Sequence, residues 1–193
     1  MEENKLGYKN IYYPPGGILL WIIILLELIT FGLTLVAMVI ISKSNVELFH
    51  TSKMMLNTTL GSINTIVLLT SGFLMAQSTH YFKLKNFDKS SFYLKLVLLT
   101  GTLFCIIKSY EFYHKSIAGI TLEYNTFFTF YWLLTGFHFV HVLVGLVILF
   151  IMLLSMKKNS SAVKEEDFEA SSAFWHMCDL IWLILFPVIY LIF

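Results

Sequence analysis

The sequence predicts an all-α fold, an integral membrane bundle of five transmembrane helices that forms a single membrane domain over residues 1–193. Hydrophobic residues make up 58% of the chain and charged residues only 13%, and the mean hydropathy is +0.77. A soluble domain of this length needs more polar surface than this composition supplies. Long apolar runs also recur between short polar segments, and about 20 such residues suffice for a bilayer-crossing helix. The expected spans are residues 18–42, 56–79, 92–113, 126–156 and 171–193.

The first span, residues 18–42, follows a polar terminus and the helix-breaking segment Pro14-Pro15-Gly16-Gly17. Its single charged residue is Glu27. An ionised carboxylate deep in a membrane is costly, so we expect Glu27 to be protonated or hydrogen-bonded. The residues alone leave two interpretations open, a proton-active or lipid-contacting carboxyl, and an acid that ties two helices together.

Residues 43–53 are expected to form a short polar loop before the second span, residues 56–79. This second span carries no charged residue, and a stripe at helical spacing joins Gly61, Thr65 and Gly72. Small residues let helix backbones approach closely, so the stripe predicts tight helix packing.

The third span, residues 92–113, has the shortest uncharged core. Lys108, Glu111 and His114 follow one another at intervals of three residues and therefore share a helix face. We expect the lysine and the glutamate to neutralise each other at the edge of the membrane.

The fourth span, residues 126–156, contains no Lys, Arg, Asp or Glu. Thr135, His138, His141 and Gly145 share one face of this helix. Imidazoles facing lipid would be costly, so this face is expected to pack against other helices.

The last hydrophilic segment, residues 157–169, is interpreted as a surface loop that ends in acidic residues at a helix start. In the fifth span, residues 171–193, His176 and Asp179 lie three residues apart, so the acid can hold the imidazole. Pro187 is expected to kink this helix.

Loop lysines predict the orientation of the bundle, with the N-terminus in the cytoplasm and the C-terminus outside. Three loop lysines, Lys43, Lys53 and Lys115, fall on the outer side. The nine on the cytoplasmic side are Lys5, Lys9, Lys83, Lys85, Lys89, Lys95, Lys157, Lys158 and Lys164.

The polar residues are compatible with three function classes, and no nucleic-acid partner is expected at a net charge of +1. A metal or haem site is not favoured, because a di-iron bundle needs two Glu-x-x-His motifs and only Glu111-x-x-His114 is present. A proton-coupled transporter could use Glu27, Glu111 and Asp179, although no internal repeat is visible. The third class, a packing subunit of a larger membrane protein, is modestly preferred.

Five stretches, in order along the chain from about residue 18, resemble subunit III of the haem-copper oxidases (cytochrome c oxidase subunit 3). The glutamate-containing first stretch precedes a polar second helix, a Ser-x-Glu-Phe segment, a Gly-Phe-His-x-x-His signature and a Trp-His-x-x-Asp-x-x-Trp signature. These stretches are residues 25–31, 64–72, 109–112, 135–142 and 174–182. The full-length family has seven spans, and this chain resembles the last five. Lys108 departs from the family pattern.

The resemblance implies a subunit of an oxidoreductase complex with no catalytic or metal centre of its own. It would pack against catalytic subunit I, which holds haem and copper, and against subunit II, in a bacterial cytoplasmic membrane. It would support proton uptake, aerobic electron transport and the stability of the catalytic subunit, and it would bind phospholipid.

The resemblance also implies roles for individual residues. Glu27 and Glu111 would be related to lipid or protons, whereas an internal polar network would comprise His138, His141, His176 and Asp179. The alternative, that all of them only pin helices together, stays open. A second alternative also stays open, in which the chain is an accessory protein of nitric oxide reductase, a class that this family includes.

Overall fold

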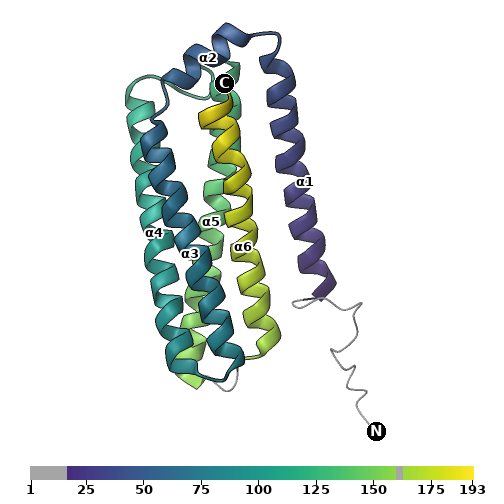
Figure 1. The fold of residues 1–193 in the computed structure, drawn as a ribbon, viewed down its shortest axis with the longest axis vertical. Coiled ribbons are helices and arrows are strands. Elements are labelled where there is room, and N and C mark those ends of the chain that lie inside the picture. Colours follow the sequence, from purple (N-terminus) through teal and green to yellow (C-terminus); the bar gives the residue numbers. More distant parts are fainter. Residues whose placement is uncertain (1–16, 160–162) are drawn as a thin grey trace.

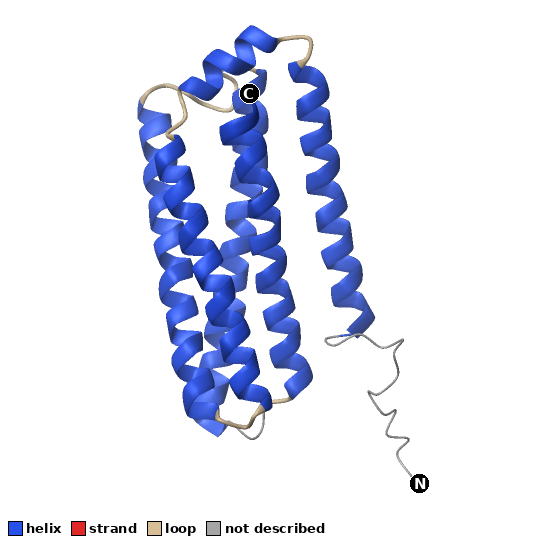
Figure 2. Ribbon diagram, in the orientation of Figure 1, coloured by secondary structure: helices blue, strands red, loops and turns tan. Residues whose placement is uncertain are grey.

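The computed structural model describes residues 17–159 and 163–193, which are helical apart from short connections (Figure 2). Five of these helices are long and apolar enough to cross a membrane, which confirms the predicted all-α bundle of five spans. The polar terminus, Lys5, Lys9 and the Pro14-Pro15-Gly16 break lie outside the described residues. The helices are α1 (Gly17–Ser42), α2 (Val46–Met54), α3 (Thr58–Lys83), α4 (Phe87–Ile117), α5 (Thr126–Asn159), α6 (Glu165–Pro187) and the π-helix η2 (Val188–Ile192).

Helices α3, α4, α5 and α6 form a compact group, and α1 lies beside it against α5 and α6 (Figure 1). Successive long helices run in opposite directions, so the start of α1 and the α3–α4 and α5–α6 connections share one end of the bundle. The α4–α5 connection, α2 and the end of the chain lie at the other end (Figure 1). This alternation is what the five predicted spans require.

The expectation of a loop over residues 43–53 is wrong, because α2 forms there and crosses the end of the bundle (Figure 1). Its inner face buries Phe49 and Ser52, which are three residues apart. The Phe49 ring packs edge-on against Phe127 and Phe193, with centroids 5.5 and 5.2 Å apart. Tertiary contacts of this narrow face therefore stabilise a helix in a segment whose composition is polar.

The expected loop over residues 157–169 is also shorter than predicted, because α5 continues to Asn159 and α6 already begins at Glu165. The three acids at residues 165–167 do occupy the first turn of α6, where negative charge favours a helix start. At Pro187 the α-helix gives way to the π-helix η2, so the predicted irregularity takes the form of a change of helix type.

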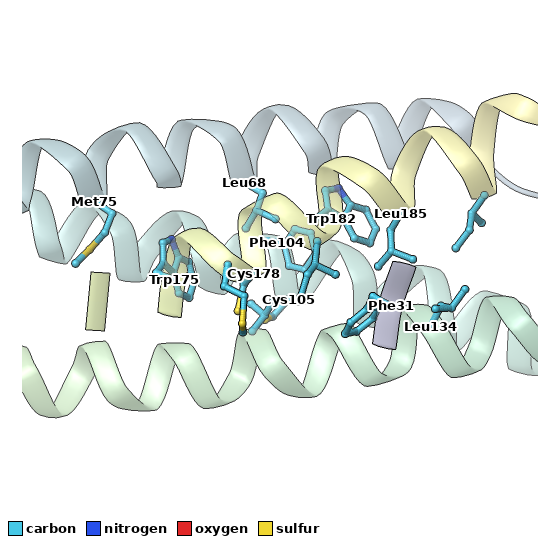
Figure 3. Packing of buried hydrophobic residues seen from close by; sticks show 14 of the residues in the cluster. Phe31, Leu68, Met75, Phe104, Cys105, Leu134, Trp175, Cys178, Trp182 and Leu185 are labelled. Carbon is cyan, nitrogen blue, oxygen red and sulfur yellow. The ribbon is translucent and has the colours of Figure 1, made fainter. Parts of the chain in front are cut away.

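The centre of the bundle is packed with large side chains from α3, α4 and α6 (Figure 3). Trp175 and Trp182 on α6 are almost completely buried, and Phe104 meets Trp182 edge-on with centroids 5.1 Å apart. Cys105 and Cys178 are buried as free thiols between the helices. Because lipid is as apolar as this core, close packing rather than water exclusion holds such helices together.

Small residues permit this packing, as the stripe on α3 predicts. Gly61 faces Phe186 and Tyr190, and Gly72 faces the Asp179 carboxylate with no room for a Cβ. Between them, the Thr65 hydroxyl accepts a hydrogen bond of 3.0 Å from the Trp182 indole. The α3–α6 contact is therefore fixed by backbone proximity at two points and by a hydrogen bond between them.

We expect Gly101→Ala to destabilise the bundle. A Cβ at this position on α4 would lie 2.7 Å from the Trp175 ring and 2.8 Å from Leu146. Trp175 is fully buried and has no free space to move into, so overpacking should cost about 1–3 kcal/mol. The measurement is the free energy of unfolding in detergent micelles.

Gly136→Ala on α5 is the matched control, because a Cβ there would meet no heavy atom within 4 Å. Alanine is also the better helix former by about 1 kcal/mol, so this variant should be neutral or slightly stabilised. Equal destabilisation of the two variants would contradict the packing argument.

Candidate functional site

A fully buried ion pair lies where α4, α5 and η2 meet. Lys108 Nζ donates a hydrogen bond of 3.0 Å to Glu111 Oε2, and both residues are on α4. The same ammonium group donates to the hydroxyls of Tyr131 on α5 (3.3 Å) and Tyr190 on η2 (2.8 Å). Both hydroxyls in turn donate to Glu111 Oε1, over 2.9 and 2.6 Å. We call these four residues the Lys108 cluster.

The hydrogen bonds of the Lys108 cluster form a closed set. The three ammonium protons each have an acceptor, and both carboxylate oxygens of Glu111 have donors. Aromatic rings surround the cation, with centroids of Phe112, Tyr131, Trp182 and Tyr190 at 4.9–5.4 Å from Nζ. A cluster with no free donor on the lysine is suited to holding helices together.

Lys108 and Glu111 pair as expected, and their side chains are only 1% and 4% exposed, so the pair faces the interior of the bundle. His114, predicted to share their face, is exposed. Sequence reasoning also missed Tyr131 and Tyr190, which lie 23 and 82 residues from Lys108. No spacing rule could have found them, although two Tyr hydroxyls inside apolar spans are themselves a signal that a partner is needed.

Glu27 and His141 join α1 to α5. Glu27 Oε1 lies 3.4 Å from His141 Nε2, and the other ring nitrogen, Nδ1, is 2.8 Å from the backbone oxygen of Phe137. Because a carbonyl can only accept, Nδ1 must carry a proton. The other ring nitrogen, Nε2, therefore faces the Glu27 carboxyl group.

His138, one turn from His141, is fully buried and is stacked on Trp182 with centroids 5.3 Å apart. Both of its ring nitrogens lack a hydrogen-bond partner among the described residues. The predicted inward face of α5 is thus observed, with Thr135 and His138 buried and Gly145 against Trp175.

His176 and Asp179 lie one turn apart on α6, with Nδ1 and Oδ2 separated by 3.5 Å. This distance is too long for a good hydrogen bond, and both Asp179 oxygens are buried without a partner in the described part of the chain. The His176 side chain is 43% exposed, so it links the buried acid to the outer surface of the bundle.

The six residues expected as lipid- or proton-related groups and as a polar network thus fall into separate groups. Glu111 belongs to the Lys108 cluster, and Glu27 pairs with His141. His176 pairs loosely with Asp179. His138 packs against aromatic rings. Across residues 17–159 and 163–193, no three His, Cys, Asp or Glu side chains gather in a way that could hold a metal ion.

We expect Lys108→Met to cost about 3–5 kcal/mol of unfolding free energy, because Glu111 would keep a buried charge without its counterion. Combining it with Glu111→Gln removes both charges and should cost less than the sum of the single changes. The measurement is a double-mutant cycle of unfolding in detergent.

The control cycle uses Lys83 and Glu169, an ion pair at the end of the bundle whose lysine side chain is 49% exposed. Exposed pairs contribute about 0–1 kcal/mol, so Lys83→Met should be mild. If Lys108→Met were equally mild, the buried cluster would not hold the helices as described.

Comparison with known proteins identifies the family of this chain. The sequence model described as "Cytochrome c oxidase subunit III" matches residues 46–192, which run from α2 to η2. This range excludes α1, so the resemblance of residues 25–31 around Glu27 lies outside it.

Curated relatives point the same way. "Probable cytochrome c oxidase subunit 3" of Rickettsia bellii is 30% identical over 132 residues, which are 67% of this chain and 47% of the relative. "Cytochrome c oxidase subunit 3" of Drosophila yakuba is 32% identical over 129 residues, covering 66% and 48%. The protein of the same name from Artemia franciscana is 32% identical over 128 residues, covering 66% and 49%. The chain thus spans about half the length of the curated relatives it matches.

Proposed function

This chain belongs to the cytochrome c oxidase subunit III family, and we propose that it serves a haem-copper terminal oxidase as a non-catalytic membrane subunit. The observation that carries the proposal is the family match over residues 46–192, which coincides with the four packed helices and their cap α2. In this role the chain contacts catalytic subunit I, and subunit II, and supports aerobic electron transport. Haem and copper belong to the catalytic subunit.

Support of proton uptake is the finer part of the proposal, and the Glu27–His141 pair is its candidate group. Glu27 Oε1 lies 3.4 Å from His141 Nε2, and the second carboxylate oxygen, Oε2, is buried without a partner among the described residues. A carboxyl group between an imidazole and an unfilled hydrogen-bonding position is suited to exchanging a proton.

Phospholipid is proposed to contact the same region. A pocket of about 240 Å³ lies between α1 and α5, lined by Thr30, Phe31 and Thr34 on one side and by Leu133 and Phe137 on the other. The threonine hydroxyls are satisfied by backbone oxygens of their own helix, so the pocket presents methyl groups and rings that suit an acyl chain.

The proposed location is a bacterial cytoplasmic membrane, with the start of α1 on the cytoplasmic side. Lysines support this orientation, because the α3–α4 and α5–α6 ends of the bundle carry most of them. The family match over residues 46–192 supports a subunit rather than an independent proton-coupled transporter.

The proposal is tested by purifying the tagged chain in mild detergent from its native membranes, with untagged membranes as the control. We expect co-purified haem in a reduced-minus-oxidised spectrum, a large multi-span subunit and oxygen consumption. Nitric oxide consumption by the same haem-containing sample would instead identify an accessory protein of nitric oxide reductase. A colourless sample that contains only this chain would contradict both.

We expect Glu27→Gln to leave the complex assembled but to change phospholipid retention or shorten the lifetime of its activity. The amide keeps the size of the side chain but cannot exchange a proton with His141. The measurement is the half-life of oxygen consumption during turnover, together with phosphorus analysis of the purified complex.

Glu47→Gln on α2 is the matched control, because this acid is exposed and its side chain makes no described contact. It should leave both readouts unchanged. Complete loss of assembly in Glu27→Gln would instead assign the glutamate a structural role.

A further inference from the structure

An apolar groove runs along the outer face of the bundle between α4 and α5, on helix faces that the Lys108 cluster and the Glu27–His141 pair do not occupy. Its volume is about 920 Å³. Its walls include Leu99, Thr102 and Leu103 on α4 and Leu143, Val147 and Phe150 on α5. Four of the apolar walls, Leu99, Leu103, Val147 and Phe150, are 41–64% exposed, so side chains of this chain leave the groove open.

The lining of the groove has almost no hydrogen-bonding capacity. Thr102 is the polar residue in it, and its hydroxyl donates a 2.7 Å hydrogen bond to the backbone oxygen of Leu98. An occupant therefore meets methyl, methylene and ring surfaces. This chemistry fits hydrocarbon chains.

The lining also distinguishes an acyl chain from a partner helix. Transmembrane helices pack closely where small residues let their backbones approach. The small residues nearest the groove, Gly101 and Gly145, point inward against Trp175 instead. The exposed walls are branched or aromatic, so they do not favour close approach of a second helix backbone, and they suit flexible chains.

Positive charge lies at one end of the groove. This end of the groove points toward the end of the bundle that carries the α3–α4 and α5–α6 connections. Lys95 precedes Leu99 by one helical turn on α4, and Lys157 follows Phe150 by two turns on α5. Intervals of three or four residues place each lysine on the stripe that lines the groove. Both are exposed, and neither forms an ion pair within the described residues.

The acidic residues of this end are engaged or balanced elsewhere. Glu169 pairs with Lys83, and Asp88 neighbours Lys89 in the first turn of α4. The acids at residues 165–167 occupy the first turn of α6, whose N-terminal dipole attracts them. The positive charge next to the groove thus remains available to an anionic group.

We propose that this groove is a binding site for an anionic diacyl phospholipid, with its acyl chains between α4 and α5 and its phosphate group at Lys95 and Lys157. Basic residues at the end of an apolar furrow between transmembrane helices favour such lipids. A zwitterionic lipid of equal chain length would fill the furrow equally well but would gain less from the two lysines. Neither the oxidase assignment nor Glu27 is needed for this site.

The test uses the full chain in nanodiscs that contain equal amounts of phosphatidylglycerol and phosphatidylcholine with identical acyl chains. Native mass spectrometry then counts the lipids retained after release from the disc. We expect phosphatidylglycerol to be retained in preference. The double change Lys95→Gln and Lys157→Gln should lower the retained ratio of the two lipids by roughly tenfold.

The double change Lys43→Gln and Lys53→Gln is the matched control, because it removes the same charge at the opposite end of the bundle. It should leave the retained ratio unchanged. If both double variants reduced the ratio equally, the lipid would respond to net charge and the proposed site would be overturned.

Val147→Trp separates seating in the groove from attraction to the lysines alone. The side chain at this position is 58% exposed, so the larger residue fills the groove without entering the core. It should reduce the retention of both lipids while Lys95 and Lys157 stay in place. Unchanged retention of both lipids in Val147→Trp would refute an acyl chain in the groove. A second variant, Val147→Cys, tests for a protein occupant. A disulfide cross-link from this cysteine to another protein or to a second copy of the chain would also refute the proposal.

Discussion

The ion pair between Lys108 and Glu111 is almost fully buried in the bundle, so both charges depend on the groups packed around them. Tyr131 and Tyr190 supply those groups, and each hydroxyl both accepts from the lysine and donates to the glutamate. Since these residues come from α4, α5 and η2, satisfying the charges also fixes where three segments meet. A buried pair is weak evidence of net stability, but it strongly disfavours arrangements in which either charge loses its partner.

The change from α6 to the π-helix η2 positions a residue of the Lys108 cluster. Pro187 cannot donate its backbone hydrogen bond, and the helix type changes directly after it. Three residues later, Tyr190 lies fully buried against Gly61 and reaches both charged groups. The change of helix type and the glycine on α3 thus support the same contact, which places Tyr190 in the core.

The remaining buried polar groups are organised differently, because several of them lack partners. Asp179, Asn64 and His138 have buried atoms without a hydrogen bond among the described residues, whereas the Lys108 cluster is complete. A fully satisfied cluster can hold helices together, whereas buried polar groups without a partner are unusual in folded proteins and require an explanation. The Glu27–His141 pair belongs to the second kind, and it also joins the loosely packed α1 to the rest of the bundle.

Local patterns in the sequence predict the number of spans, their approximate limits and the inward face of α5, because long uncharged runs and three-to-four-residue spacing are local properties. They also predict, through the stripe on α3, that helices approach closely there. The helix over residues 46–54 depends on tertiary structure instead, because it is held by the contact of Phe49 with Phe127 and Phe193. The burial of Lys108 likewise depends on tertiary contacts. A lysine near the end of an apolar run can reach the membrane surface or turn inward, and the choice depends on Tyr131 and Tyr190, whose positions relative to α4 no local pattern specifies.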